Sequence, residues 1–431
     1  MRGAAAFLTT AILAAAIPCR GQAPQTPQSL TLQQAEQIAI QNHPQIQVAT
    51  QLASAAAAQV VEAKSSYYPQ TYGSLTGVEA EHNSRVAAGV LNNPIIYDRF
   101  ADGVAVNQLV TDFGRTYELV KSSNLHAKAQ QENVTATRAD VLLRVNQAYF
   151  AVLKSQAVLQ VAEQTVKSRQ LVADQTSALQ KNNLKSGLDA SFANVDLAQA
   201  QLLLIQAQND VQSSFADLST ALGYSDQRMF VLADQPPQPS PPADFAPLVQ
   251  EALQNRPELI GQDFNVKSAQ SYATAERELW LPTISAVGVA GLIPFRQDTL
   301  ASRYAAAGFN VNVPIFNGRL FTARKNEATA RANAQQQFLR DLQNRVVRDV
   351  RAAWLNANSA FQRLSVTEQL FNQATQAFDL AQSRYGLGLS SIVELSQAQL
   401  NKTQAEITKV SAQYDYEGQI AYLDYQLGRM K

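Results

Sequence analysis

Cysteine is almost absent from this chain of 431 residues, which contains only Cys19. A single cysteine excludes a disulfide framework and a metal centre built from several thiolates. The three histidines, His43, His82 and His126, lie far apart and lack the spacing of metal ligands on one helix. The sequence also has no Walker-type phosphate loop and no nucleophile elbow. We therefore expect no cofactor, no metal and no enzymatic activity, and any active process must draw its energy from a partner.

Net charge is also lacking, because 35 Lys and Arg residues balance 35 Asp and Glu residues. A chain without net positive charge is not expected to bind nucleic acid by neutralising phosphates. Mean hydropathy is −0.18, and beyond the N-terminus no run of about 20 apolar residues occurs. The sequence therefore predicts no membrane-spanning helix.

The one apolar run stands at the N-terminus. Arg2 followed by AAAFLTTAILAAAI is typical of a secretory signal peptide, which we assign to residues 1–21. Two fates are open for Cys19: it carries a lipid after cleavage, or it is removed with the signal. Pro18 stands where a lipidation motif has a small residue, which favours cleavage near residues 21–23. We expect the mature protein to be exported.

Glycine and proline are missing from two long stretches, residues 115–186 and 319–385. As helices at about 1.5 Å per residue, each would be about 100 Å long. Helices of that length without internal stops are typical of coiled coils rather than of ordinary globular packing.

The second long stretch ends at a tight turn. Gly386 and Gly388 break the helix, and helical pattern resumes at Ser390 or Ser391. Ser391 followed three residues later by Glu394 predicts an N-cap with a capping-box partner. Small residues then recur every seven positions, which indicates close packing of two helices in a coiled coil. These residues are Ala398, Ala405 and Ala412.

The same block occurs 205 residues earlier, so the chain is an internal duplication. Asn183 aligns with Gly388, and asparagine is the next-best residue after glycine for a left-handed helix end. Ser186 and Asp189 align with Ser391 and Glu394. The predicted domains are a first repeat at 22–233, a Pro-rich linker at 234–244 and a second repeat at 245–431.

Each repeat has the same predicted order: a helix pair, a strand pair and a pair of long helices. The predicted ranges are 31–67, 70–113 and 115–222 in the first repeat, and 245–280, 282–316 and 318–428 in the second. The first strand pair is joined by a loop around residues 92–102. Pro69 and Pro282 align at an offset of 213, whereas Gly114 and Gly318 align at 204, so the first strand hairpin should be nine residues longer.

The last predicted strand alternates clearly, with Phe309, Val311 and Val313 on one side and Asn310 and Asn312 on the other. Such alternation fits the wall of a transmembrane β-barrel, apolar outside and polar inside. Four strands cannot close a barrel, and open edges are not tolerated in lipid, so several chains must share one barrel. The alternative is a soluble four-stranded sheet that caps a helical bundle.

These features together resemble the outer-membrane efflux proteins of the TolC type. The most specific segment is Tyr385-x-x-Gly388-x-x-Ser391-x-x-Glu394-x-x-x-Ala398-Gln399, which closes on Leu427-Gly428. The resemblance implies a mainly α fold with a small β part: long antiparallel coiled-coil helices form an α-barrel, and four strands per chain contribute to a shared 12-stranded transmembrane β-barrel. It further implies a homotrimer in outer-membrane lipid that extends as a tube into the periplasm.

The function implied is the exit duct of a tripartite efflux pump for small molecules. Its partners would be a periplasmic adaptor protein and an inner-membrane transporter of the proton-driven or ABC type. The resemblance also implies a gate where the long helices turn, at Glu394, Gln397, Tyr385 and Asp174. Gln397 stands where a second acidic residue is common, and Ser390 stands where the family pattern has an arginine of the closing network.

Two other functions remain open. The same fold could serve as the exit duct of a type I protein secretion system, or the chain could be an exported coiled-coil structural or adhesion protein. The matched strand pairs argue against a pure coiled coil, and the genes beside this one would distinguish the two kinds of duct.

Overall fold

The computed structural model describes residues 29–81, 84–85, 95–234, 236, 238–296, 298 and 300–430. The predicted signal peptide, with Cys19, lies outside these residues, as does His82. The helices are α1 Leu32–Asn42, α2 Pro44–Ser65, α3 Arg115–Lys181, α4 Gly187–Ala221, α5 Ala246–Asn255, α6 Pro257–Arg277, the 3-10 turn η1 Glu278–Trp280, α7 Leu320–Gly386 and α8 Ile392–Gln426. The strands are β1 Gln70–Val78, β2 Arg99–Thr111, β3 Thr283–Arg296 and β4 Arg303–Asn312.

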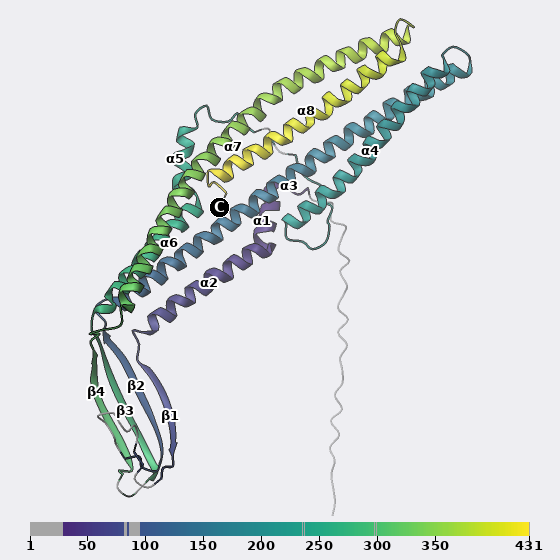
Figure 1. Ribbon diagram of the computed structural model, residues 1–431. Coiled ribbons are helices and arrows are strands. Elements are labelled where there is room, and N and C mark those ends of the chain that lie inside the picture. Colours follow the sequence, from purple (N-terminus) through teal and green to yellow (C-terminus); the bar gives the residue numbers. More distant parts are fainter. Residues whose placement is uncertain are drawn as a thin grey trace, which may run out of the picture.

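The molecule is strongly elongated (Figure 1). The strands form one end, and the turns that join α3 to α4 and α7 to α8 form the other. Helices α3 and α7 each have 67 residues, or about 100 Å at 1.5 Å per residue, as the two stretches without glycine and proline predict. Within the described ranges, every helix lacks the run of apolar sequence that crossing a bilayer requires.

Small residues form the seams between the long helices. Ala193, Ala200 and Ala207 on α4 are buried at a spacing of seven. On α8, Ala405 and Ala412 are buried, and Ala398 is partly buried against the core at the helix turn. A seam without bulky side chains lets two long helices approach closely along their length.

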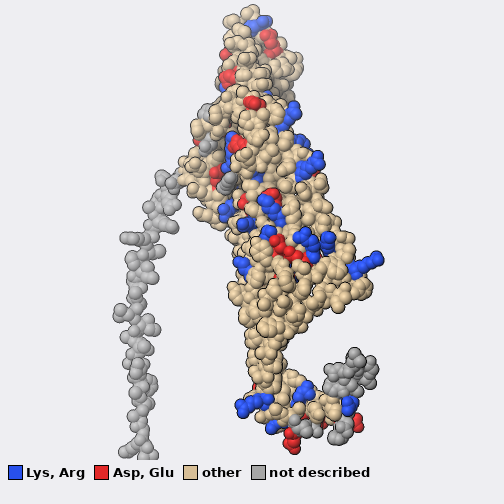
Figure 2. Space-filling view, turned by 90° about the vertical axis from the view of Figure 1, so that its left-hand side faces the viewer, with Lys and Arg blue, Asp and Glu red and all other residues tan. Residues whose placement is uncertain are grey.

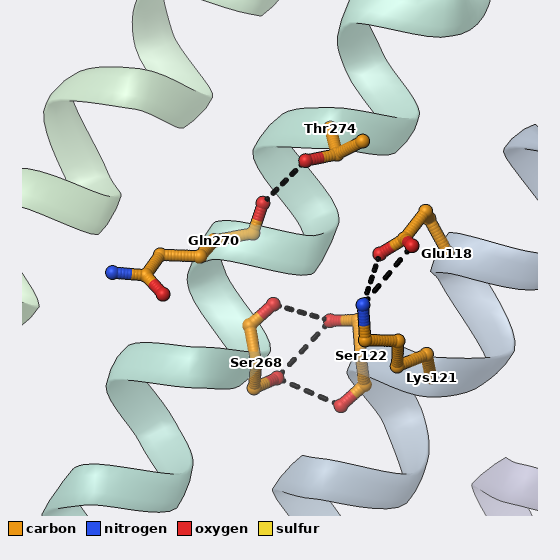
Figure 3. Close-up of polar contacts among 6 residues, drawn as sticks. All are labelled: Glu118, Lys121, Ser122, Ser268, Gln270 and Thr274. Atoms are coloured by element: carbon orange, nitrogen blue, oxygen red, sulfur yellow. Dashed lines mark hydrogen bonds and ion pairs between the residues drawn. The ribbon is translucent and has the colours of Figure 1, made fainter.

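The seams between the shorter and longer helices also depend on small residues. Ser122 on α3 and Ser268 on α6 exchange hydrogen bonds, each hydroxyl donating to the other residue's carbonyl oxygen, at 2.9 and 2.8 Å (Figure 3). Nearby, a Cβ at Gly261 would lie only 3.3 Å from the Cβ of Glu132. Helix α6 of the second repeat therefore packs tightly on α3 of the first.

The four strands form one antiparallel sheet in the order β1-β2-β3-β4. The sequence placed the loop of the first strand pair at 92–102, which is wrong at its end. Residues 99–102 already belong to β2 and pair with the last residues of β1, as Arg99 does with Val78. Backbone pairing across the hairpin thus extends the strand beyond what side-chain alternation indicated.

The registers correct the alignment of the two repeats. Gln70 pairs with Asn107 and Thr283 pairs with Asn312, so the second strands of the two hairpins match at an offset of 205 rather than 204. The strand-to-helix turns agree, because Phe113 and Gly318 are the first of two left-handed residues in each repeat, at φ 58° and 60°. The first hairpin is therefore eight residues longer, not nine. The sequence alignment paired glycine with glycine, whereas the backbone conformation pairs Phe113 with Gly318.

The two faces of the sheet differ in polarity. One face carries most of the large apolar side chains, and the other carries most of the hydroxyl and amide groups. The apolar face includes Leu75, Val104, Val106, Ile284, Leu292, Phe309 and Val311, and the polar face includes Gln70, Ser74, Thr76, Asn107, Thr283, Ser285, Asn310 and Asn312.

Charged residues occur only near the loop ends of the described strands, away from the helices. They are Arg99 and Asp102 on β2, Arg296 on β3 and Arg303 on β4. On the face seen in Figure 2, charges of both signs are scattered over the helical body, and an uncharged band separates it from the charged far end of the sheet.

The linker between the repeats lies against α7 and α8. The Tyr416 hydroxyl donates to the carbonyl oxygen of Pro239, and Trp354 Nε1 donates to that of Pro242 at 2.8 Å. On α3, the buried Tyr149 hydroxyl lies 2.9 Å from the carbonyl oxygen of Leu30 and 2.6 Å from that of Ala233. These contacts fix the linker and the start of the described chain to one side of the helical layer.

Candidate functional site

The two helix turns at the end far from the sheet are built alike. Asn183 and Gly388 both have positive φ, 57° and 76°. In each turn the next amide bonds back to the carbonyl five residues earlier, Leu184 to Leu179 at 2.9 Å and Leu389 to Arg384 at 2.8 Å. This pattern satisfies the last carbonyls of a helix. Gly386 is the last residue of α7 and is not left-handed, so Gly388 alone supplies the special conformation.

The helices that follow begin with serine caps. Ser186 Oγ accepts a hydrogen bond from the amide of Asp189 at 3.1 Å, and the Asp189 carboxylate accepts one from the amide of Ser186 at 3.1 Å. A closed capping box of this kind satisfies two amides that would otherwise lack partners.

The second turn differs from its prediction. Ser391 Oγ accepts from the amide of Glu394 at 3.3 Å, but the Glu394 carboxylate does not bond back. It lies 3.6 Å from Arg384 Nε, across the turn on α7. The predicted capping box is therefore only half formed, because the longer glutamate side chain reaches a cation on the preceding helix.

Tyr385 is half-buried, and its hydroxyl is enclosed without a hydrogen-bond partner among the described residues. The ammonium of Lys185, from the other turn, lies 4.0 Å from the centre of its ring, a favourable cation–π contact. Ser390 Oγ is likewise enclosed without a partner in the described chain.

The other predicted gate residues are exposed. Asp174 accepts a hydrogen bond from Gln170 at 2.9 Å, one turn away on α3. Gln397 donates to Asn401 at 2.9 Å on α8. Within the described chain Asp174 has no hydrogen bond to Tyr385, so the gate roles of these residues and of Glu394 stay predictions.

A buried polar cluster, on the long helices between the turns and the sheet, was not predicted from the sequence. Arg169 on α3 is buried and forms an ion pair with Asp196 on α4 at 3.3 Å. Its guanidinium also bonds to the side chain of Gln399 on α8, and Ser396 on α8 donates to Asp196. The cluster therefore ties the first pair of long helices to the second.

Burial lowers the pKa of the Arg169 guanidinium, and the charge of Asp196 opposes that shift. One signal could have revealed this residue. Ala162, Arg169 and Thr176 are buried at a spacing of seven, so an arginine stands in the small-residue seam. A buried arginine needs a carboxylate partner, and Asp196 lies between Ala193 and Ala200 in the facing seam.

Comparisons with known proteins agree with this duplicated architecture. The family model described as outer membrane efflux protein matches residues 36–224 and 248–429, one match for each repeat. The chain belongs to the outer membrane efflux protein family. The family consists of channel proteins, and this outer membrane efflux protein acts as an exit duct at the outer membrane.

Individual relatives are distant in sequence. Outer membrane protein TolC of Vibrio cholerae is 26% identical over 318 residues, covering 70% of this chain and 71% of TolC. Outer membrane efflux protein BepC of Brucella suis is 23% identical over 373 residues, covering 83% and 76%. The crystal structure of a membrane protein from Pseudomonas aeruginosa has a TM-score of 0.81 at 20% identity, covering 92% of this chain and 93% of that one. The predicted fold class and outer-membrane location are thereby confirmed.

Proposed function

We propose that three copies of this chain form a channel-tunnel that is the exit duct of a tripartite pump for small molecules. Each copy contributes four strands to a 12-stranded barrel in the outer membrane, and the helices continue the tube into the periplasm. A periplasmic adaptor and an energised inner-membrane transporter complete the pump. One observation carries the proposal: an apolar-faced sheet whose two outer strands, β1 and β4, have no neighbour within the described chain. Such edges are not tolerated in lipid, and known barrels start at about eight strands.

The internal duplication indicates how two copies would meet. Strands β1 and β3 match at an offset of 213, and β2 and β4 at 205, as the pairs Gln70–Asn107 and Thr283–Asn312 require. Inside the chain β2 already pairs with β3. The equivalent pair is β4 of one copy with β1 of the next, and repetition of this step three times closes a ring.

The same equivalence gives the register of the seam between β4 of one copy and β1 of the next. The inner pair Asn107–Val287 corresponds to Asn312 of one copy opposite Ser74 of the next. The inner pair Val106–Gly288 corresponds to Val311 opposite Leu75. Both new pairs match in character, amide with hydroxyl on the polar face and apolar with apolar on the other. A slip by one residue would exchange the faces, so the polarity agrees with this register and excludes slips by an odd number of residues.

A disulfide tests the seam. In a Cys19→Ser background, Asn312→Cys with Ser74→Cys places two thiols on directly opposed residues, about 4.5–5.5 Å apart between Cα atoms, within the range of a disulfide. Oxidation should give a covalent trimer on a denaturing gel. The matched control is Asn312→Cys with Val78→Cys, four residues out of register and about 14 Å away along the strand. A monomer in both cases, together with a monomeric mass in detergent, would refute the proposal.

A substitution tests the lipid face. If Val311 faces acyl chains near the midplane, Val311→Arg should impair membrane assembly by roughly 2–4 kcal/mol. Asn310→Arg is the matched control, because the neighbouring side chain points to the opposite face and should alter conductance instead. The measurement is the fraction of protein recovered as folded trimer from membranes. Equal recovery of the two variants would argue against the barrel.

A further inference from the structure

A groove of about 790 Å³ lies among α3, α7 and α8, midway along the molecule. Its volume falls within the range of small-molecule sites, which is about 300–1,000 Å³. One wall is closed by an ion pair between Lys154 on α3 and Asp415 on α8, at 2.8 Å. The groove lies within a single chain, so it does not depend on assembly.

Helices α7 and α8 present the groove on the side opposite to the linker. At about 100° per residue, Asp415, Gly418 and Tyr422 lie on the other side of α8 from the linker-binding Tyr416. On α7, Arg363 likewise lies opposite Trp354. If the chain forms the proposed tube, the side with the linker, α1 and α5 is the outer one, because extra elements inside would fill the conduit. The placement of the groove in the lumen therefore rests on the proposed function.

Gly418 is unexplained by the packing of the chain itself. Glycine inside a helix is destabilising relative to alanine, yet a Cβ at Gly418 would meet no atom within 4 Å. No close approach and no left-handed conformation require glycine here. Its effect is to leave the floor of the groove open.

The groove also contains polar groups with unused capacity. Arg363 is exposed on its wall, and the described residues give its guanidinium no ion pair. The carbonyl oxygen of the Gln419 side chain is enclosed and has no donor in the described chain. Tyr414 and Tyr422, both half-buried, line the same space and offer ring surfaces.

We propose that this groove binds small organic anions that carry an aromatic ring and a hydrogen-bond donor. Arg363 pairs with the carboxylate, because a guanidinium matches that group in geometry and charge. Lys154 can donate to the same anion while it keeps Asp415, since an ammonium has three donors. The tyrosines contact the ring, Gln419 accepts from the ligand's donor, and Gly418 leaves room for the ring.

Calorimetric titration of the detergent-purified full chain with 4-hydroxybenzoate tests the proposal. We expect saturable binding of one molecule per chain. Benzoate, which lacks the donor, should bind several-fold more weakly, and 4-hydroxybenzyl alcohol, which lacks the charge, should not bind measurably. Absence of saturable 4-hydroxybenzoate binding would overturn the proposal.

Three variants locate the site. Arg363→Gln should weaken binding about tenfold, as expected for one charge-assisted contact, and Gly418→Leu should abolish it by filling the floor. Arg340→Gln is the matched control, because Arg340 is exposed on the opposite side of α7. Unchanged binding in both groove variants, or equal loss in the control, would overturn the proposal. Binding in a chain that fails to cross-link and has a monomeric mass in detergent would refute the trimer and not the groove, whereas a channel-forming chain without binding would refute the groove alone.

Discussion

The two helix turns share a backbone and differ in charge. In the first, Asp189 is used by its own helix, where it closes the capping box with Ser186. In the second, Glu394 leaves its cap and pairs with Arg384 across the turn. A duplicated fold can therefore keep one turn as a structural end and change the other into a charged end, with little alteration of the backbone.

The helices above the turns differ as well. The buried Arg169–Asp196 pair of the first repeat has no counterpart, since the positions 205 residues later are Ala374 and Asn401. Gln399 of the second repeat serves the cluster of the first. A polar contact between the two repeats thus depends on a charge pair that occurs in the first repeat alone.

The largest expected effect comes from breaking this contact. Arg169→Leu leaves the partly buried Asp196 carboxylate, whose side chain is 16% exposed, without its cation, which should cost up to about 3–5 kcal/mol, the range for a fully buried pair. Hydrogen exchange around residues 169 and 399 should speed up accordingly. The double variant Arg169→Leu with Asp196→Leu should recover part of the loss, because it removes the unpaired charge. A single variant with wild-type exchange would show that the cluster does not hold the helices together.

A smaller effect is expected at the left-handed residues. Gly388→Ala should destabilise its turn by about 1–2 kcal/mol, because a side chain is strained at φ 76°. Asn183→Gly should change the first turn by only a few tenths of a kcal/mol, since asparagine already tolerates this conformation. Local hydrogen exchange in the two turns measures both. Equal effects would mean that the turns do not rely on these residues.

Removal of the serine caps should also destabilise the two turns by different amounts. Ser186→Ala opens a closed box and should cost about 1 kcal/mol, whereas Ser391→Ala removes a single bond and should cost about half as much. Exchange of the first-turn amides of α4 and α8 reports each loss. A larger cost at Ser391 would contradict the half-formed box.

The smallest free-energy effect, but the most direct on function, concerns Glu394. Its exposed pair with Arg384 is worth about 0.2–1 kcal/mol. If Glu394 rings the pore, Glu394→Gln should reduce cation selectivity and block by a trivalent cation in single-channel recordings. Arg384→Gln should strengthen both, by no more than about fivefold, because it frees the carboxylate. Asp189→Asn, in the closed box, is the control, and an equal response there would deny Glu394 a special role.

Much of the fold followed from local patterns. The absence of glycine and proline predicted the two long helices, and the seven-residue repeat of alanine predicted their seams. Asn183 opposite Gly388 was recognisable because few residues adopt a left-handed conformation at low cost. The start of β2 and the alignment of Phe113 with Gly318 were missed, because strand ends and offsets are set by pairing with another strand rather than by the local sequence.

The sequence by itself determined the duplication, the helix lengths, the turns and the family, since these depend on residues close together or on direct repetition. Only the tertiary structure decided which charges meet. Arg169 finds its partners on two other helices, Glu394 turns to Arg384 rather than to its own cap, and Lys185 lies over Tyr385. Such contacts join residues that are from 10 to more than 200 positions apart, and an isolated helix carries no information about which neighbour its polar side chains will face.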